Sequence, residues 1–357
     1  MQFELDEDRA LLKNATRELL EKESALADSR AIMEEAPEGH AKDLHARLGE
    51  LGYPGILLDE ERGGMGPLAF VAVLHEMGRV AFPGPFLEVA VAARVLAGCE
   101  GPAAADWSAR AAAGEALVVL ATSEDPASAD PAQPAATFES GRVRGTKTFV
   151  PTGAFADALL VSTTAGLVLV ERPGAGWNAQ PLTTIDHAQR FAEIAFDDPG
   201  ELVAEGERAS ALLADALRCG ALGASATMLG LMEHALELAI DYTMEREAFG
   251  APLASFQALQ HRAADMLLRT ESSRSAVYRA GWALEAVAPD ADTLISVAKA
   301  YAGPAARSVC GETIQFHGGV GFTWEYNPHI YLKRVKTLEL FHGSTRYHTD
   351  IAYDSLT

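Results

Sequence analysis

Apolar positions recur at helical spacing in the N-terminal third of the chain. This spacing predicts helices over residues 41–51, 68–80 and 87–97, after an amphipathic start with leucines at positions 5, 11, 12, 19 and 20. Gly and Pro clusters at 63–67 and 83–85 break the pattern between these segments. We therefore expect an N-terminal α-helical domain over residues 1–115.

From about residue 116 the pattern changes to short β-branched runs bounded by Gly, Pro and Asp. The runs are ALVVLAT, RVRGTKTFV, ALLVSTT and LVLVERP, and a polar, proline-rich loop, SEDPASADPAQPAA, separates the first two. Such runs are typical of antiparallel strands. We expect a middle antiparallel β domain over residues 116–204, with its strands ending near residues 198–200.

Long helical patterns return after residue 205. Residues 209–245 are rich in Ala, Leu and Met with few helix breakers, and further helices are predicted over 257–287, over 293–313 and after Pro328. Helices of this length suit a bundle. The predicted fold class is therefore α+β, with a C-terminal four-helix bundle over residues 205–357.

Composition narrows the classes of function. Asp and Glu number 50 against 29 Lys and Arg, and the formal net charge of −21 disfavours nucleic-acid binding, which depends on neutralising phosphates. Cys99, Cys219 and Cys310 form no CxxC motif, so the sequence indicates neither a metal site nor a disulfide framework. No apolar signal core and no apolar run of about 18 residues is present, and we expect a cytoplasmic protein with no membrane partner.

The segment YTMEREAFGAPLASFQALQ (242–260) carries groups suited to an anionic cofactor. Arg246 supplies a permanently charged guanidinium for a pyrophosphate. Phe249 offers an aromatic face to an adenine or flavin ring. Gln257 follows the helix break at Gly250, with amide groups that can bond a ribose or a flavin edge.

The segment QFHGGVGF (315–322) adds a glycine-rich turn. Gly318 and Gly319 have no side chains to keep backbone N–H groups away from an anion. Gln315 would add a side-chain contact from the end of the preceding helix. Taken singly, each of these two motifs is more often an ordinary helix end or loop, so their combination matters.

Four segments of the chain resemble the acyl-CoA dehydrogenase flavoprotein family. They are the two segments just described, together with LGELGYPGILLDEERGGMG (48–66) and FHGST (341–345). The resemblance keeps the family's order and extends over nearly the whole chain. The resemblance implies FAD as cofactor, oxidation of an acyl-CoA to its trans-2-enoyl-CoA, and an electron-transfer flavoprotein as acceptor. It also implies that the motif residues reach across a subunit interface to the ADP half of a flavin lying mainly on a neighbour. The implied cofactor contacts are Arg246, Phe249, Gln257, Gln315, Gly318, Gly319 and Ser344.

The usual catalytic base of the family is replaced here. His342 stands where the family has the glutamate that removes the substrate's α-proton. The alternative position for that glutamate falls near Gly220, where Asp215 and Glu207 are the nearest acids. A neutral imidazole can accept a proton, but this reaction usually relies on a desolvated carboxylate. We expect His342 to be a structural residue or a substrate or cofactor contact more than a base.

The flavin-facing positions also depart from the family pattern. Phe149, Val150 and Pro151 replace its Trp-Ile-Thr, and Pro151 has no N–H to donate, although Thr152 follows directly. The family's Thr-Glu-Pro corresponds to residues 122–126, TSEDP, inside the proline-rich loop. We expect the flavin-ring site of this chain to be impaired.

Three interpretations follow. The first is a hetero-oligomer, of the α2β2 kind found among bacterial enzymes that act on steroid side-chain CoA esters, in which a paralogous subunit supplies the flavin cradle and the glutamate. The second is a self-sufficient homo-oligomer that uses His342 or a repositioned acid, or a monooxygenase-like offshoot. The third is a scaffold that binds no flavin, against which Arg246, Gln315 and Gly319 argue. The pattern of losses favours the first.

Overall fold

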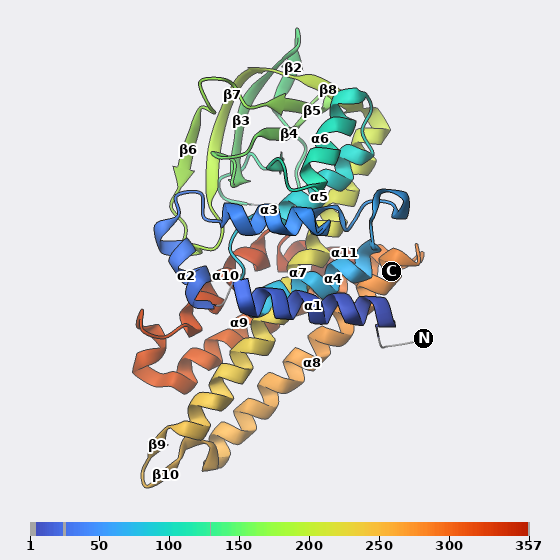
Figure 1. The fold of residues 1–357 in the computed structure, drawn as a ribbon. Helices are drawn as coiled ribbons and strands as arrows, with labels where there is room; N and C mark the ends of the chain where they lie inside the picture. The colour runs from blue at the N-terminus through green and yellow to red at the C-terminus, as the bar shows by residue number, and fades with distance from the viewer. Residues whose placement is uncertain (1–4, 24–25, 129, 356–357) are drawn as a thin grey trace. The chain divides into compact units, whose positions relative to one another are not determined.

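The computed structural model describes residues 5–23, 26–128 and 130–355. By compactness the chain forms two units, each described here by itself. Unit 1 comprises Met1–Ser29, Val71–Phe82 and Ala221–Thr357, and unit 2 comprises Arg30–Phe70 and Pro83–Gly220. Figure 1 shows the elements in chain order.

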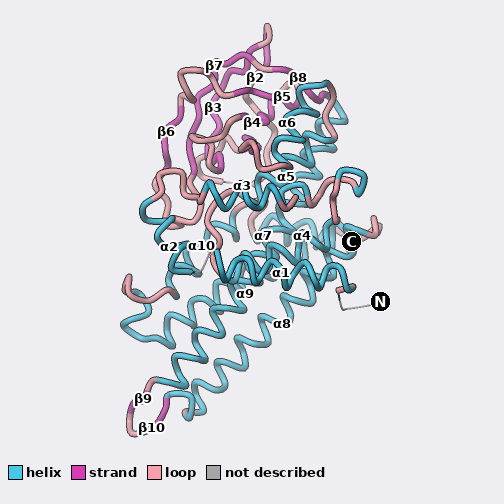
Figure 2. Tube along the Cα trace, in the orientation of Figure 1, coloured by secondary structure: helices cyan, strands magenta, loops and turns pink. Residues whose placement is uncertain are grey.

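Unit 2 holds the two four-stranded sheets and several helices (Figure 2). Its helices are α3 (Lys42–Glu50), α5 (Phe86–Ala97), α6 (Pro102–Ala112) and most of α2 (Leu26–Glu35), with short 3-10 turns at Tyr53–Gly55 and Glu60–Arg62. All residues of α5 except Glu88 and Arg94 are apolar, and ten of its twelve residues are buried. A helix that is apolar all round belongs to a core, so α5 is the central helix of this unit.

The strands of unit 2 form two four-stranded sheets within the described residues, in the orders β1-β4-β5-β8 and β2-β3-β7-β6. Their bounds are β1 Val118–Ala121, β2 Thr137–Glu139, β3 Arg142–Pro151, β4 Ala158–Thr163, β5 Gly166–Glu171, β6 Ala179–Leu182, β7 Phe191–Pro199 and β8 Glu201–Glu205. All of their pairings are antiparallel except β1 with β4, which is parallel. The register of β3 against β7 shifts between Lys147 and Val150.

Unit 1 is helical. It holds α1 (Glu7–Glu23), α8 (Gln257–Glu285), α9 (Ala291–His317), α10 (Pro328–Leu340) and α11 (Thr345–Asp354), with the larger parts of α4 (Gly66–Arg79) and α7 (Gly206–Glu245). A short hairpin, β9 (Glu247–Ala248) with β10 (Ala251–Pro252), and the 3-10 turn Leu253–Ser255 join α7 to α8, and the 3-10 turn η4 (Gly318–Phe322) follows α9.

Two glycines let α4 and α7 approach each other closely. A Cβ at Gly78 would lie 2.2 Å from the Thr227 carbonyl oxygen, and one at Gly230 would lie 1.9 Å from that of His75. Both distances are too short for any side chain, so only glycine permits this crossing. The crossing brings the polar side chains of α4 within reach of those of α7.

The helix α7 is long and apolar enough to span a membrane by composition alone, with a mean hydropathy of 1.2 in its most apolar window. However, 67% of that window is buried in the protein. The core helix of a globular protein shows the same combination.

The predicted fold class is confirmed: helices, then a β region, then long helices, each close to its expected range. The parallel β1–β4 pair is a departure from the purely antiparallel pattern that we expected. The division into domains at residues 115 and 204 stays a prediction.

Candidate functional site

The first predicted cofactor motif lies where α7 ends and α8 begins (Figure 1). The chain folds back after Arg246, and the Leu253 N–H donates to the Arg246 carbonyl at 2.8 Å. Phe249, at φ 55°, and Gly250, at φ 82°, form the turn of this hairpin in the left-handed region. The Phe249 side chain is 96% exposed. An aromatic ring held out in this way is available to a ligand or to a second chain.

Arg246 and Gln257 are exposed at the same junction. Within the described part of the chain, neither side chain has a hydrogen-bond or ion-pair partner. The charge of the guanidinium and the amide of the glutamine are therefore uncommitted. Both are free to bind an anionic, hydrogen-bonding ligand.

The second motif is an open turn at the end of α9. Gly318, at φ 62°, ends the helix, and its N–H donates to the Gln315 carbonyl. A Cβ added at Gly318 or Gly319 would meet no atom within 4 Å, and Gln315 is exposed on the last helical turn. The backbone of this turn is thus accessible from solvent, as an anion cradle requires.

Two contacts hold the motifs at one end of the bundle. The rings of Tyr242, one turn before Arg246, and His317, next to Gly318, stack with centroids 4.3 Å apart and planes at 23°. On the neighbouring helix, Arg262 of α8 pairs with Glu312 of α9 at 2.5 Å. The structure therefore brings Arg246, Phe249, Gln257, Gln315, Gly318 and Gly319 to the same end of unit 1.

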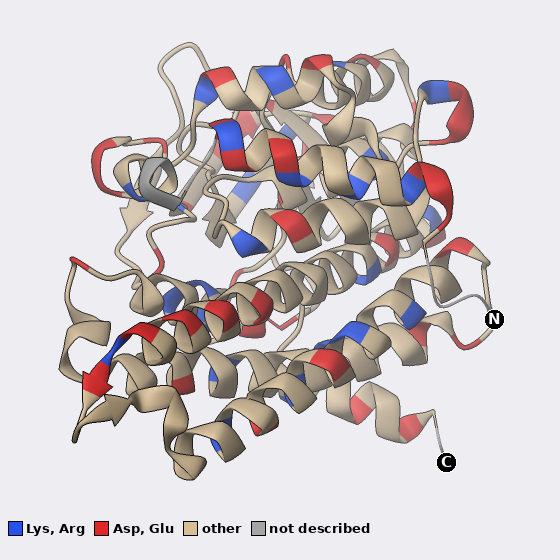
Figure 3. Cartoon of the chain, turned by 60° about the horizontal axis from the view of Figure 1, so that its bottom comes forward, with Lys and Arg blue, Asp and Glu red and all other residues tan. Residues whose placement is uncertain are grey.

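This end of the bundle fits the ADP half of FAD. A guanidinium and a side-chain-free turn suit a pyrophosphate, an exposed aromatic ring suits an adenine, and amide side chains suit a ribose. In the view of Figure 3, Lys and Arg positions are scattered among Asp and Glu and form no continuous basic stripe. The fit to the ADP half of FAD therefore depends on the Arg246 guanidinium, the glycine turn and the amide side chains at this end, and not on a wider basic surface.

The turn between α10 and α11 differs from the exposed cofactor end, because most of its polar groups form hydrogen bonds within the chain. His342, at φ 57°, and Gly343, at φ 92°, form a left-handed pair. Lys299 of α9 is 1% exposed. Its ammonium donates to the Glu339 carbonyl at 3.1 Å and to the Gly343 carbonyl at 2.8 Å. The buried ammonium fixes the backbone on both sides of His342.

His342 is held neutral in this turn. Burial, with the Lys299 ammonium and His348 nearby, lowers the pKa of His342 to about 3. Its carbonyl accepts a hydrogen bond from His348 Nε2 at 2.8 Å, and His348 Nδ1 meets Ser296 Oγ at 3.1 Å. The His342 Nε2 is shielded from water without a hydrogen-bond partner among the described residues. An imidazole with so low a pKa is a weak proton acceptor.

Ser344 lies in this C-terminal turn, apart from the other predicted cofactor residues. Its Oγ accepts the Tyr347 N–H at 3.2 Å, so it is the N-cap of α11. Lys299 and His317 are separated by 18 residues of α9, or about 27 Å of helix at 1.5 Å per residue. The glycine turn after His317 and the turn held by Lys299 are thus far apart along one helix. A cofactor contact at Ser344 stays a prediction.

The segment of unit 2 expected to face a flavin is occupied by internal contacts. The Lys147 side chain is fully buried and donates to Glu124 at 2.5 Å and to Ser162 at 2.9 Å. Thr152, at φ 51°, donates its N–H to the Arg190 carbonyl at 2.7 Å. Its hydroxyl oxygen accepts from the Gln189 amide at 3.1 Å. The polar groups of Thr152 are therefore already engaged.

The acid nearest to the alternative base position is also engaged. Arg94 donates to the Asp215 carboxylate from Nε at 2.6 Å and from Nη2 at 3.3 Å. Its Nη1 donates to the Leu57 carbonyl at 3.0 Å. Arg218 approaches the same carboxylate at 3.3 Å. The Asp215 carboxylate is therefore committed to ion pairs with two arginines.

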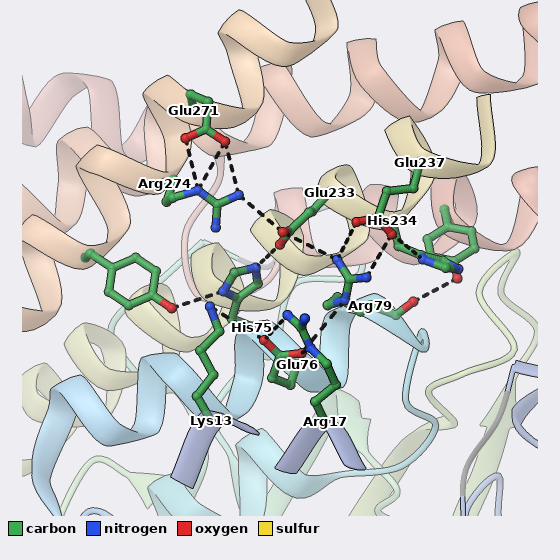
Figure 4. A network of polar contacts seen from close by, with 12 residues as sticks. Lys13, Arg17, His75, Glu76, Arg79, Glu233, His234, Glu237, Glu271 and Arg274 are labelled. Atoms are coloured by element: carbon green, nitrogen blue, oxygen red, sulfur yellow. Dashed lines mark hydrogen bonds and ion pairs between the residues drawn. The ribbon is translucent and has the colours of Figure 1, made fainter. Parts of the chain in front are cut away.

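Unit 1 contains a buried polar network that sequence inspection missed (Figure 4). His75 donates to Glu233 and accepts from the Tyr278 hydroxyl at 3.0 Å. Glu76, 1% exposed, accepts from Arg17 at 2.8 and 3.0 Å. Burial alone would raise the pKa of Glu233, but the His75 hydrogen bond and the nearby guanidiniums hold it well below its usual range.

Two further arginines complete the network. Arg79 binds Glu237 at 2.8 and 3.0 Å, and Arg274 lies 3.4 Å from Glu233. The sequence signal was present, since HEMGR at 75–79 and EHALE at 233–237 place charged residues at helical spacing within apolar segments. Their function is to join α1, α4, α7 and α8.

Comparison with known proteins agrees with these features. Residues 6–115 match the model of the acyl-CoA dehydrogenase N-terminal domain, and residues 211–357 match that of the C-terminal domain. The chain is 29% identical to the acyl-CoA dehydrogenase IpdE2 of Mycolicibacterium smegmatis, over 96% of this chain and 94% of that protein.

Solved structures agree as well. A steroid acyl-CoA dehydrogenase, the Tcur3481-Tcur3483 variant G363A, superposes with a TM-score of 0.86 at 27% identity and covers 98% of both chains. The ChsE4-ChsE5 complex of Mycobacterium tuberculosis superposes with a TM-score of 0.87 at 24% identity, over 100% of this chain and 99% of that one, and shows the same fold. This chain therefore belongs to the acyl-CoA dehydrogenase family, whose members are FAD-dependent oxidoreductases, and the FAD prediction is confirmed.

Proposed function

We propose that this chain is a subunit of a hetero-oligomeric acyl-CoA dehydrogenase, in which it completes the FAD site of a partner chain of the same fold. One observation carries the proposal. The cofactor end of unit 1 presents unpaired, exposed groups, whereas the turn at the usual glutamate position holds a neutral His342 whose surroundings are closed. Groups that would serve a neighbour's cofactor are present, and the residue at the usual glutamate position is a histidine.

The residues of this chain have a binding function in this scheme. Arg246 would neutralise the cofactor's pyrophosphate, and the absence of side chains at Gly318 and Gly319 would let the pyrophosphate approach the backbone of the turn. Gln257 and Gln315 orient the ribose and the adenine through their amides. When bound, FAD would supply the acceptor for the hydride that leaves the acyl chain. The partner subunit supplies the glutamate that removes the α-proton.

Neither His342 nor Asp215 is well suited to act as the base of the reaction. At pH 7 an imidazole with a pKa of about 3 is neutral, but its affinity for a proton is far below that of an ordinary histidine. Asp215 is held by Arg94 and Arg218. These features support a division of labour between unlike subunits over a homo-oligomer with an unusual base.

The relatives point to the class of substrate and partner. A relative at 27% identity bears a double name and is called a steroid acyl-CoA dehydrogenase. We therefore propose a steroid side-chain CoA ester as substrate, a paralogous subunit in an α2β2 assembly, and an electron-transfer flavoprotein as acceptor. A cytoplasmic location accords with this proposal.

The test is to purify the chain alone and together with candidate paralogous subunits. Absorbance at the flavin maximum and protein mass determine the FAD content and the stoichiometry of each species. We expect little FAD on the isolated chain and one FAD per heterodimer in the complex. Steroid side-chain and short-chain acyl-CoA esters are then compared as substrates of the complex.

Two outcomes would contradict the proposal. One FAD per chain in the isolated protein, together with acyl-CoA dehydrogenation, would establish the homo-oligomer. A stable complex without FAD would establish the scaffold. Replacing the partner's glutamate by glutamine is the matched control, since it should abolish turnover and leave the FAD content unchanged.

A further inference from the structure

We infer that Tyr242, His317 and Tyr326 form an aromatic clamp that positions the glycine turn against Arg246 for cofactor binding. The inference rests on the proposed function and assigns to these three residues a role in it. None of them is expected to touch the reacting atoms. They are positioning residues.

The geometry joins three separate segments. Tyr242 belongs to the last turns of α7 and His317 is the last residue of α9, and their rings stack at 4.3 Å. Tyr326, from the loop before α10, stands edge-on to Tyr242 at 6.2 Å and 88°, and meets His317 at 6.0 Å and 66°. Stacked and edge-to-face arrangements of this kind are the favourable ones for aromatic pairs.

The clamp is fixed at its centre by the histidine. The carbonyl of Thr313 can only accept a hydrogen bond, so the contact of His317 Nδ1 with it at 2.8 Å places the proton on Nδ1. Thr313 in turn donates its hydroxyl to the Ala235 carbonyl of α7 at 2.9 Å. Burial lowers the pKa of His317, so the ring is neutral at pH 7. The orientation of the ring is thereby tied to both helices.

The position of the clamp explains why it matters for the cofactor. Tyr242 precedes Arg246 by one helical turn, and His317 directly precedes Gly318. The turn beyond His317 is open, with no atom within 4 Å of a Cβ at Gly318 or Gly319. Because packing does not confine Gly318 and Gly319 from outside, the placement of these two residues depends on the contacts just before and after them. The clamp supplies those contacts.

The test replaces the Tyr242 ring. Tyr242→Leu keeps apolar volume and loses the stack, whereas Tyr242→Phe keeps the ring. In the complex with the partner subunit, we expect Tyr242→Leu to raise the Kd for FAD about tenfold, and Tyr242→Phe to restore it to within about twofold. Flavin fluorescence during dilution measures the Kd.

A control variant separates the loss of positioning of the glycine turn from a general loss of stability. Ile295→Ala truncates a core side chain, 2% exposed, near the other end of α9. It should lower the thermal midpoint at least as much as Tyr242→Leu does and leave the Kd for FAD unchanged. If both variants weaken FAD equally, the clamp has only a structural role and the inference is overturned.

A second measurement needs neither partner nor cofactor. In the isolated chain, Tyr242→Leu should speed hydrogen exchange of the amides at residues 318–322, while those in the middle of α10 keep their rates. Unchanged exchange at the turn would refute the clamp. A wild-type complex without FAD would instead contradict the proposed function, and the exchange experiment would still decide on the clamp.

Discussion

The two ends of α9 present contrasting environments. At its C-terminal end, the Gln315 side chain is exposed without a partner among the described residues, and the backbone at Gly318 and Gly319 is open to solvent. Near its N-terminal end, the buried Lys299 ties the carbonyls of Glu339 and Gly343 into a closed turn. Unused polar groups indicate a ligand from outside the chain, whereas groups that satisfy one another indicate structure. The same helix supports both.

The largest effect should come from removing the Lys299 ammonium, which should lower the free energy of unfolding. Lys299→Met keeps most of the side-chain volume but removes an ammonium that serves two buried carbonyls. Because hydrogen bonds from a charged donor are worth about 1.5–3 kcal/mol each, we expect the free energy of unfolding to fall by about 3 kcal/mol. Urea unfolding of the isolated chain measures this loss. Lys22→Met, at an exposed position, should change it little.

Removing a group from the open end should affect cofactor binding and not folding. Arg246→Ala leaves no buried partner unpaired, so the isolated chain should unfold as the wild type does. In the complex we expect the Kd for FAD to rise about 100-fold, as for the loss of a charge-assisted contact to a phosphate. Equilibrium dialysis measures it. Arg346→Ala, on an arginine whose side chain is 91% exposed, should leave the Kd unaltered.

The pH dependence of stability sharpens the same contrast. His342 has a pKa of about 3 in the folded chain and about 6.5 when unfolded, so between these values the unfolded state binds more protons. Stability is therefore lost as the pH falls, by about 2 kcal/mol from this group between pH 7.5 and pH 5. Urea unfolding at both pH values should show a smaller loss for His342→Gln. An identical loss in the variant would mean that His342 is not held neutral by the closed turn.

The smallest effect concerns the helix that joins the two ends. Gly311 lies within α9, and a Cβ there would meet no atom within 4 Å. Gly311→Ala should raise the free energy of unfolding of the isolated chain by about 0.5–1 kcal/mol, the cost of glycine inside a helix. Gly230→Ala is the contrasting variant, since its Cβ would collide with the His75 carbonyl and must destabilise. Thermal unfolding of both variants measures the difference.

Much of the fold could be predicted because the pattern is local. The helix predicted over 41–51 spans Lys42–Glu50, and the one predicted over 87–97 spans Phe86–Ala97. The parallel pairing of β1 with β4 could not be predicted, since residue types determine a strand's burial but not the direction of its neighbour. The network around Glu233 depends on the close helix crossing at Gly78 and Gly230, which no periodicity reveals.

The candidate site was predictable in part for the same reason. Arg246 and Phe249 lie close together in the chain, and their spacing identified them. The presence of a serine at position 344 has a local explanation. A serine three residues before the Tyr347 amide is a typical N-cap, and Ser344 Oγ accepts that N–H. The lowered pKa of His342 depends first on burial and then on Lys299, which is distant in sequence, and only the folded structure brings these two causes together.

The continuous α9 also limits how this chain can evolve. A helix rises 1.5 Å and turns about 100° per residue, so a single inserted or deleted residue between Lys299 and His317 would rotate the glycine turn by about 100° relative to the turn at His342. Insertions there are tolerable only near whole multiples of a helical turn, and even those would shift one end by about 5 Å. Length variation among homologues should therefore accumulate in the loop at residues 122–136 and be absent from this helix.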